Sequence, residues 1–132
     1  MITNIKQFKE SFGFNIPKVQ PKTKTELIEI IEKTIENSPK DNKVDLNFID
    51  TSLITDMSSL FYYIDRFNGD ISNWDVSNVN NMAYMFRNSE FNGDISNWDV
   101  SNVTNMKYMF KYSPLESNPP SWYKESNVDT SN

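Results

Sequence analysis

A chain of 132 residues is long enough for one compact domain and too short for two ordinary ones. The formal net charge of −5 argues against a nucleic-acid binder, which needs basic residues to replace the counterions around phosphates, and no stretch approaches the roughly 20 apolar residues of a membrane span. Cysteine and histidine are both absent, so we expect no disulfide, no Ser-His-Asp or Cys-His catalysis, no enzyme, no cofactor and no metal site.

The N-terminal part is predicted to be an extension over residues 1–22 followed by a capping segment over 23–41. From Thr23 to Asn37 the apolar residues recur at helical spacing, and most glutamates fall on the other face. Pro39 follows shortly after, as is usual behind the end of a helix. We therefore expect a helix here that covers the open apolar end of the next segment.

An internal repeat organises residues 42–114. The 13 residues from Phe67 to Val79 recur unchanged from Phe91 to Val103, with a period of 24 residues. A weaker copy precedes them at an offset of 25, and a decayed copy with two prolines follows as a C-terminal cap. The predicted units are 42–66, 67–90 and 91–114, and the cap and tail are 115–132.

Two spacings within one unit predict its local structure. Ile71, Trp74 and Val76 have the L-x-x-L-x-L spacing of a leucine-rich repeat, which predicts strands near Ile71–Val76 and Ile95–Val100. The apolar residues from Val79 to Phe86 recur as on one face of a short helix. The predicted fold class is α/β: a short right-handed leucine-rich-repeat-type solenoid with one parallel strand and one short helix per repeat of about 24 residues, and an N-terminal capping helix.

The 20 residues from Phe91 to Phe110 resemble the repeat of the BspA-like leucine-rich-repeat surface proteins, which also occurs in bacterial lipoprotein-like chains of unknown function. The resemblance implies a surface-associated or secreted protein and, as in some members, adhesion to host proteins. It brings no catalytic residues. This chain differs from long members in having only about three units, and it shows neither a secretory signal nor a lipid-attachment cysteine.

Repeated polar positions are the candidate binding residues. They flank the apolar strand positions and should point away from the core. The alternative interpretation is a solvated face whose Asp and Asn side chains satisfy turns. The Trp and Met columns are predicted to be core. The candidate residues are Asn73, Asp75, Asn97, Asp99 and Asp50.

Asp70 and Asp94 stack one repeat apart, which could imitate a glycosidase dyad or a calcium site, but the repetition alone explains their proximity. The sequence therefore favours a non-catalytic protein-interaction module with the strand face as contact surface. It predicts a monomer with a protein partner of unknown identity and with no nucleic-acid partner. The alternative function is a surface adhesin or cell-envelope component.

Overall fold

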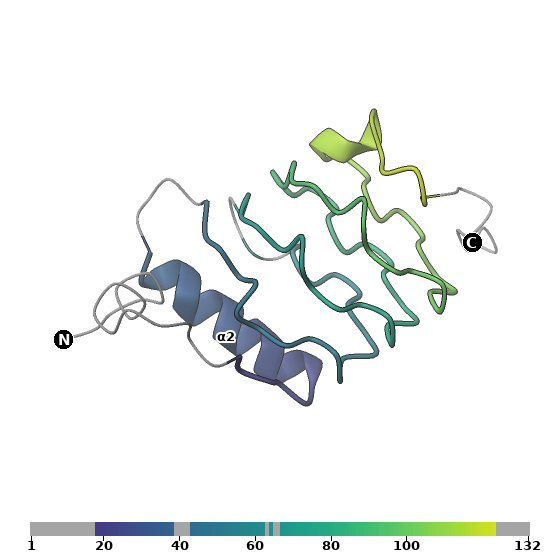
Figure 1. The fold of residues 1–132 in the computed structure, drawn as a ribbon. Helices are drawn as coiled ribbons and strands as arrows, with labels where there is room; N and C mark the ends of the chain where they lie inside the picture. Colours follow the sequence, from purple (N-terminus) through teal and green to yellow (C-terminus); the bar gives the residue numbers. More distant parts are fainter. Residues whose placement is uncertain (1–17, 39–42, 63, 65–66, 124–132) are drawn as a thin grey trace.

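The fold is a stack of backbone coils with a helix at one end (Figure 1). The computed structural model describes residues 18–38, 43–62, 64 and 67–123. Two helical elements occur in this part of the chain, and they lie at opposite ends of the stack. They are the α-helix α2, Lys24–Glu36, and the 3₁₀ helix η1, Pro114–Glu116.

The helix α2 forms where the sequence predicts it. Thr23 is its N-cap, because the Thr23 Oγ1 accepts a hydrogen bond from the backbone N–H three residues later at 3.1 Å. Leu27 and Ile31, one turn apart, are fully buried in the same core as the repeats. The predicted helix over Thr23 to Asn37 is therefore confirmed, and its apolar face contributes to the core of the stack.

Each repeat is built from β-turns joined by short irregular segments. In the repeat that begins at Phe67, a backbone N–H donates to the carbonyl three residues earlier in three turns, with distances of 3.0 to 3.2 Å. The first and fourth residues of these turns are all buried. The turns are Ile71–Trp74, Val76–Val79 and Met82–Met85, and equivalent turns recur at 46–49, 51–54 and 57–60 and at 95–98, 100–103 and 106–109.

Successive repeats are joined by isolated parallel bridges, such as Asp45 with Asp70 and Asn81 with Asn105. Alternate N–H groups of one repeat donate to carbonyls of the next: Met82 to Asn105, Tyr84 to Lys107 and Phe86 to Met109, at 2.8 to 2.9 Å. Tyr84, however, has a φ of 61°, which no β-strand residue adopts. The bridges therefore remain single and do not grow into strands.

The predicted α/β architecture is wrong. Within its described residues the chain contains no β-strand and no helix inside the repeats, so no leucine-rich-repeat-type solenoid of alternating parallel strands and short helices is formed. The expected strands at Ile71–Val76 and Ile95–Val100 and the expected helix from Val79 to Phe86 are turns and irregular backbone. The reason is that buried residues three apart also occur at the first and fourth positions of a β-turn.

Stacked phenylalanine rings fill the centre of the molecule. Phe61 stacks on Phe86 with ring centroids 5.4 Å apart, and Phe86 stacks on Phe110 at 5.8 Å. Two further rings stack on this column: the ring centroid of Phe67 lies 4.5 Å from that of Phe61, and the centroid of Phe91 lies 4.6 Å from that of Phe86. All five rings are buried, so a few large side chains supply much of the apolar area removed from water.

A column of tryptophans links the repeats. Trp74, Trp98 and Trp122 each donate the indole N–H to a carbonyl of the preceding repeat, at 2.9, 3.1 and 2.8 Å. Trp74 and Trp98 are buried, and five methionines of the repeats are fully buried. The prediction that the Trp and Met columns are core is confirmed. The methionines are Met57, Met82, Met85, Met106 and Met109.

The ends of the chain extend beyond the described structure. Residues 1–17, from the predicted extension, and residues 124–132, from the predicted C-terminal tail, lie outside the described residues. Before that tail, η1 and Trp122 pack on the last repeat, with Trp122 and Trp98 ring centroids 6.3 Å apart. Of the helices in the described part, neither has the length and apolar character needed to cross a membrane.

Candidate functional site

The predicted binding residues lie at repeated positions of neighbouring repeats, and we call this set of residues the polar face. Asp75 and Asp99 are exposed and Asp50 is half-buried, each at the equivalent position of its repeat. The two asparagines, Asn73 and Asn97, are also exposed. A hydrogen bond joins this face to the preceding repeat: the Asn73 N–H donates to the side-chain oxygen of Asn47 at 2.9 Å.

The aspartates of the polar face hold turns together. Asp75 Oδ1 accepts hydrogen bonds from the Ser77 N–H at 3.0 Å and from the Ser77 hydroxyl at 2.6 Å. Asp99 and Asp50 accept equivalent bonds from the backbone N–H two residues later, at 3.1 and 3.0 Å. These are Asx-turns, in which a short polar side chain satisfies the backbone at the start of a turn. The geometry therefore supports the turn-satisfying alternative for these three residues.

The same capping bond recurs in three columns that run along the stack. In every member an Oδ1 atom accepts from the backbone N–H two residues later, at 2.8 to 3.1 Å. Asn81 and Asn105 form this bond as well as the aspartates do, so it does not require charge. The columns are Asp45, Asp70, Asp94; Asp50, Asp75, Asp99; and Asp56, Asn81, Asn105.

These bonds make stability depend on pH. Hydrogen bonds from the Ser72 hydroxyl, the Asn47 side chain and the Ser72 N–H hold the pKa of Asp70 below its usual value. The Ser96 and Ser101 hydroxyls and N–H groups lower the pKa of Asp94 and Asp99 in the same way. The pKa of an aspartate in the unfolded chain is about 3.9. Because the pKa is lower in the folded protein, each of these carboxylates stabilises the fold at pH values above about 3.9, and this contribution is lost as the pH falls through the folded-state pKa.

We therefore expect the free energy of unfolding to decrease as the pH falls below about 4. Asp70→Asn keeps the capping oxygen and removes the titrating group, so it should make this decrease shallower. Urea unfolding measured between pH 7 and pH 2.5 tests this, with Glu29→Gln on the exposed side of α2 as the matched loss of one carboxylate. An Asp70→Asn profile parallel to that of the unmodified chain contradicts the expectation.

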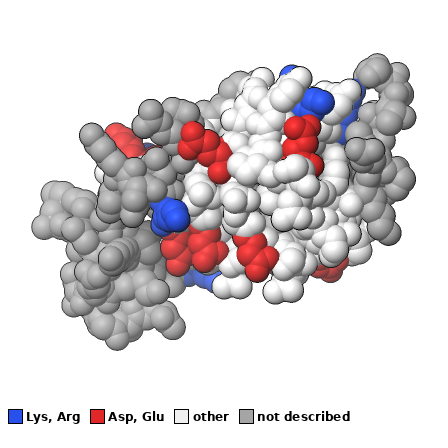
Figure 2. All heavy atoms as spheres, turned by 90° about the horizontal axis from the view of Figure 1, so that it is seen from above, with Lys and Arg blue, Asp and Glu red and all other residues white. Residues whose placement is uncertain are grey.

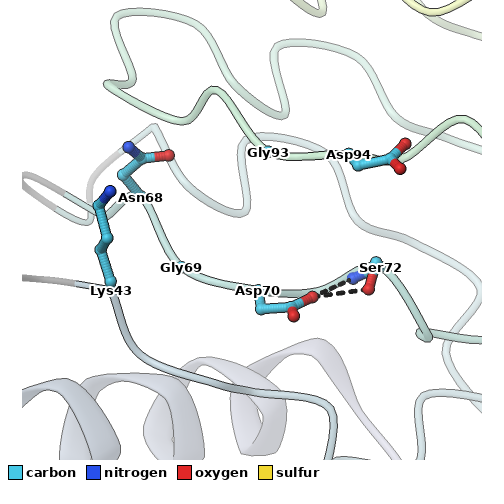
Figure 3. Close-up of a pocket in the computed structure, with 7 residues that line it drawn as sticks. All are labelled: Lys43, Asn68, Gly69, Asp70, Ser72, Gly93 and Asp94. Atoms are coloured by element: carbon cyan, nitrogen blue, oxygen red, sulfur yellow. Dashed lines mark hydrogen bonds between the residues drawn. The ribbon is translucent and has the colours of Figure 1, made fainter.

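A groove of about 330 Å³ lies between neighbouring repeats and contains the stacked aspartates. In Figure 3, Asp70 and Asp94 sit on adjacent coils, while Lys43 and Asn68 lie toward the other end of the groove. Asp70 is bonded to Ser72 and Asp94 to Ser96, as capping residues. No group of three Asp, Glu, His or Cys side chains suited to a metal occurs among the described residues. Figure 2 shows Asp and Glu in several patches over one face of the molecule.

A second surface, the tyrosine edge, lies where the third turn of each repeat ends. It consists of four tyrosines and three basic residues, with Tyr108 42% and Tyr112 62% exposed. The rings of Tyr84 and Tyr108, one repeat apart, have centroids separated by 5.7 Å. The members are Tyr62, Tyr84, Arg87, Lys107, Tyr108, Lys111 and Tyr112.

Arg87 is the centre of the tyrosine edge. Its guanidinium carbon lies 5.8, 5.6 and 5.8 Å from the ring centroids of Tyr62, Tyr84 and Tyr112. These distances are within cation–π range, so three rings hold the side chain in place. The Arg87 Nε is nonetheless buried without a hydrogen-bond partner.

Turn geometry positions three tyrosines of the edge, of which Tyr108 and Tyr112 are exposed and Tyr84 is half-buried. Tyr84, Tyr108 and Tyr112 have φ values of 61°, 52° and 60°, an uncommon conformation for a bulky residue. Each is the third residue of a β-turn, where type II turns require positive φ. Tyrosine therefore occupies positions that glycine or asparagine fill at lower conformational cost, and strain of this kind tends to occur at functional sites.

The sequence interpretation missed the tyrosines of this edge, because it placed the third segment of each repeat on a helix. The available signal was the recurrence of a tyrosine at positions 84 and 108, between two apolar residues three apart. At this repeated position Tyr108 is exposed and Tyr84 is half-buried.

The comparison with known families covers most of the chain. A family described as Mycoplasma protein of unknown function, DUF285, matches residues 29–132. The chain belongs to the DUF285 family. Nothing among the curated proteins or the solved structures matches it. The DUF285 description names no activity, so the resemblance to BspA-like surface proteins and the surface location that it implies remain predictions.

Proposed function

We propose that this DUF285 chain is a non-catalytic module that binds another protein through the tyrosine edge. The observation that carries the proposal is the exposure of Tyr108 and Tyr112 on an edge where three tyrosine rings, including that of Tyr112, hold the guanidinium of Arg87. Tyrosine and arginine are enriched at protein–protein contacts, where a few such residues contribute most of the binding energy. The composition and the rigid placement of the edge support this function.

Protein binding also fits the chemistry elsewhere in the chain. The sequence has no histidine or cysteine to act as a base, nucleophile or soft metal ligand. The two aspartates of the groove, Asp70 and Asp94, use an oxygen of the carboxylate to cap turns. These observations support a module that recognises a surface over one that catalyses a reaction.

The neighbouring repeats provide conservative replacements for the test. Ser59 occupies the position equivalent to Tyr108, and Asn88 the position equivalent to Tyr112, both with positive φ. The double variant Tyr108→Ser with Tyr112→Asn should therefore fold, with the free energy of unfolding lowered by about 1 kcal/mol for the lost ring contact. Partner affinity should decrease by about 30-fold or more, as for paired hot-spot residues.

The measurement is affinity capture from the native cell on the immobilised chain, with quantitative mass spectrometry, followed by binding constants for the captured protein. Leu53→Ala is the matched control, because Leu53 is 46% exposed and lies away from the edge in sequence. Equal capture by the tyrosine variant and the unmodified chain contradicts the tyrosine edge as contact surface.

The polar face is the second candidate surface, and removal of its charge tests it. Asp75→Asn with Asp99→Asn removes two exposed negative charges and keeps the oxygens that cap the turns. We expect this variant to retain the partner. If this variant loses the partner and the tyrosine variant retains it, the contact surface is the polar face, formed by Asn73, Asp75, Asn97, Asp99 and Asp50.

A further inference from the structure

We propose that the partner of the tyrosine edge is an acidic protein segment, and that one of its carboxylates pairs with Arg87. This inference rests on the proposed function and specifies the chemistry of the partner. It starts from the Arg87 side chain, which forms no ion pair with any carboxylate of the described chain although the chain carries a net charge of −5. An arginine among this many acidic residues is therefore left available for an acid from outside.

The surroundings of Arg87 prepare it for a carboxylate. Three tyrosine rings fix the guanidinium, which reduces the conformational entropy lost when a ligand binds. A guanidinium matches a carboxylate with two parallel N–H···O bonds, which the two terminal Nη groups of the half-buried Arg87 can form although its Nε is buried. A ligand carboxylate supplies the opposite charge that this side chain lacks.

Other charges on the edge favour an acidic segment of several residues. Lys107 Nζ lies 5.5 Å from the Tyr108 ring, and Lys111 Nζ lies 5.1 Å from the Tyr112 ring. The opposing charge is Glu116, whose Oε2 is 3.8 Å from Lys111 Nζ. Among the described residues of the edge there are therefore three cations, of which Lys107 is buried, and one of them is paired with an anion, so the local charge is positive. Such complementarity sets which partner binds and how fast.

The probe is a fluorescein-labelled peptide of eight glutamates, with eight glutamines as the neutral control, measured by fluorescence anisotropy on the full chain at 25 and 300 mM salt. We expect the glutamate peptide to bind at least about tenfold more tightly than the glutamine peptide at low salt, and less tightly at high salt. Arg87→Met should weaken binding of the glutamate peptide about tenfold or more. Arg87→Lys should recover part of this loss, because it retains the charge without the planar donors.

Two further variants separate the role of Arg87 from folding and from total charge. Arg87→Tyr introduces the residue that occupies the equivalent position, 62, in the preceding repeat, so the fold should accept it. This variant tests a second time whether removal of the guanidinium weakens binding of the glutamate peptide. Lys33→Met removes one exposed positive charge from α2 and should change affinity less than about twofold. Thermal unfolding by circular dichroism checks that each variant is folded.

Several results would overturn the inference. These are equal binding of the two peptides, unchanged binding in both neutral Arg87 variants, or tighter binding of an eight-nucleotide oligothymidine, which would indicate a single-stranded nucleic acid. If the tyrosine variant loses its captured partner while the glutamate peptide fails to bind, protein binding at the edge stands and the acidic partner is wrong. If the tyrosine variant keeps that partner, the proposed function itself fails at this surface.

Discussion

Replacing Trp98 by alanine should lower the free energy of unfolding by about 3–5 kcal/mol, the usual cost of truncating a large core aromatic. The ring is buried, with centroids 6.4 Å from Phe86 and 6.3 Å from Trp122. Its Nε1 also donates to the Ile71 carbonyl at 3.1 Å, so the variant leaves a cavity and removes one of the two hydrogen bonds that this carbonyl accepts. A loss of this size approaches the whole stability of a small domain.

Urea unfolding followed by circular dichroism measures this loss without relying on tryptophan fluorescence. Trp98→Phe separates the two contributions, because it keeps most of the apolar volume and removes the indole donor, and it should cost less than the alanine variant. Leu53→Ala serves as the exposed control, with an expected change of about 0.5 kcal/mol or less. A Trp98→Ala loss within that control range would mean that the tryptophan column is not part of the core.

The second large effect is expected from Gly69→Ala. A Cβ at Gly69 would lie 2.0 Å from the Val44 carbonyl oxygen and 2.6 Å from the Phe67 ring. The Val44 oxygen cannot move freely, because it accepts the Asp70 N–H at 2.9 Å and so joins two repeats. The backbone must therefore shift at a bond between repeats, and we expect a loss of about 3 kcal/mol or more, at the upper end for overpacking.

Gly93→Ala is the matched control, since Gly93 occupies the same position one repeat later. Its nearest contacts are atoms of the Phe91 ring at 2.7 and 2.8 Å, and the backbone oxygen of Gly69 lies farther away, at 3.3 Å. A ring can adjust where a bonded carbonyl cannot, so urea unfolding should show a smaller loss for Gly93→Ala. Equal losses, or a larger one for Gly93→Ala, would contradict this explanation.

The sequence predicted correctly those features whose residue pattern is compatible with only one local structure. The helix from Thr23 to Asn37 combines an N-cap residue, an apolar stripe and a following proline, and few alternatives satisfy all three. Trp74 and Trp98 recur at one position of an identical segment, and burial is the simplest reason for a repeated large side chain. These predictions needed only local pattern and repetition.

The architecture of the repeats was not predictable in this way. Ile71 and Trp74, like Met82 and Met85, are three residues apart, and this spacing occurs in helices, leucine-rich repeats and β-turns alike. Which of these structures forms depends on which carbonyl oxygens accept the backbone N–H groups. The Met82 N–H donates to the next repeat and the Met85 N–H closes a turn, and neither partner is visible in a pattern of apolar residues.

The candidate site was predictable only in part. Asp75 and Asp99 were correctly placed outside the core by their alternation with apolar residues. Their bonds to Ser77 and Ser101 depend on turn geometry, which the strand interpretation did not contain. Arg87 depends on three tyrosines from three repeats, a contact that requires the stacking itself.

The bonds between repeats have a consequence for how such a chain can change in evolution. Each indole donor bonds to the preceding repeat, and each bridge between two repeats joins equivalent positions. The surface that one unit presents to the next therefore matches the surface that its copy presents. Duplication of the gene segment for residues 67–90 therefore inserts a unit whose two interfaces already exist. Unequal recombination can lengthen or shorten the stack in steps of one repeat, and each step adds or removes one tyrosine position on the edge.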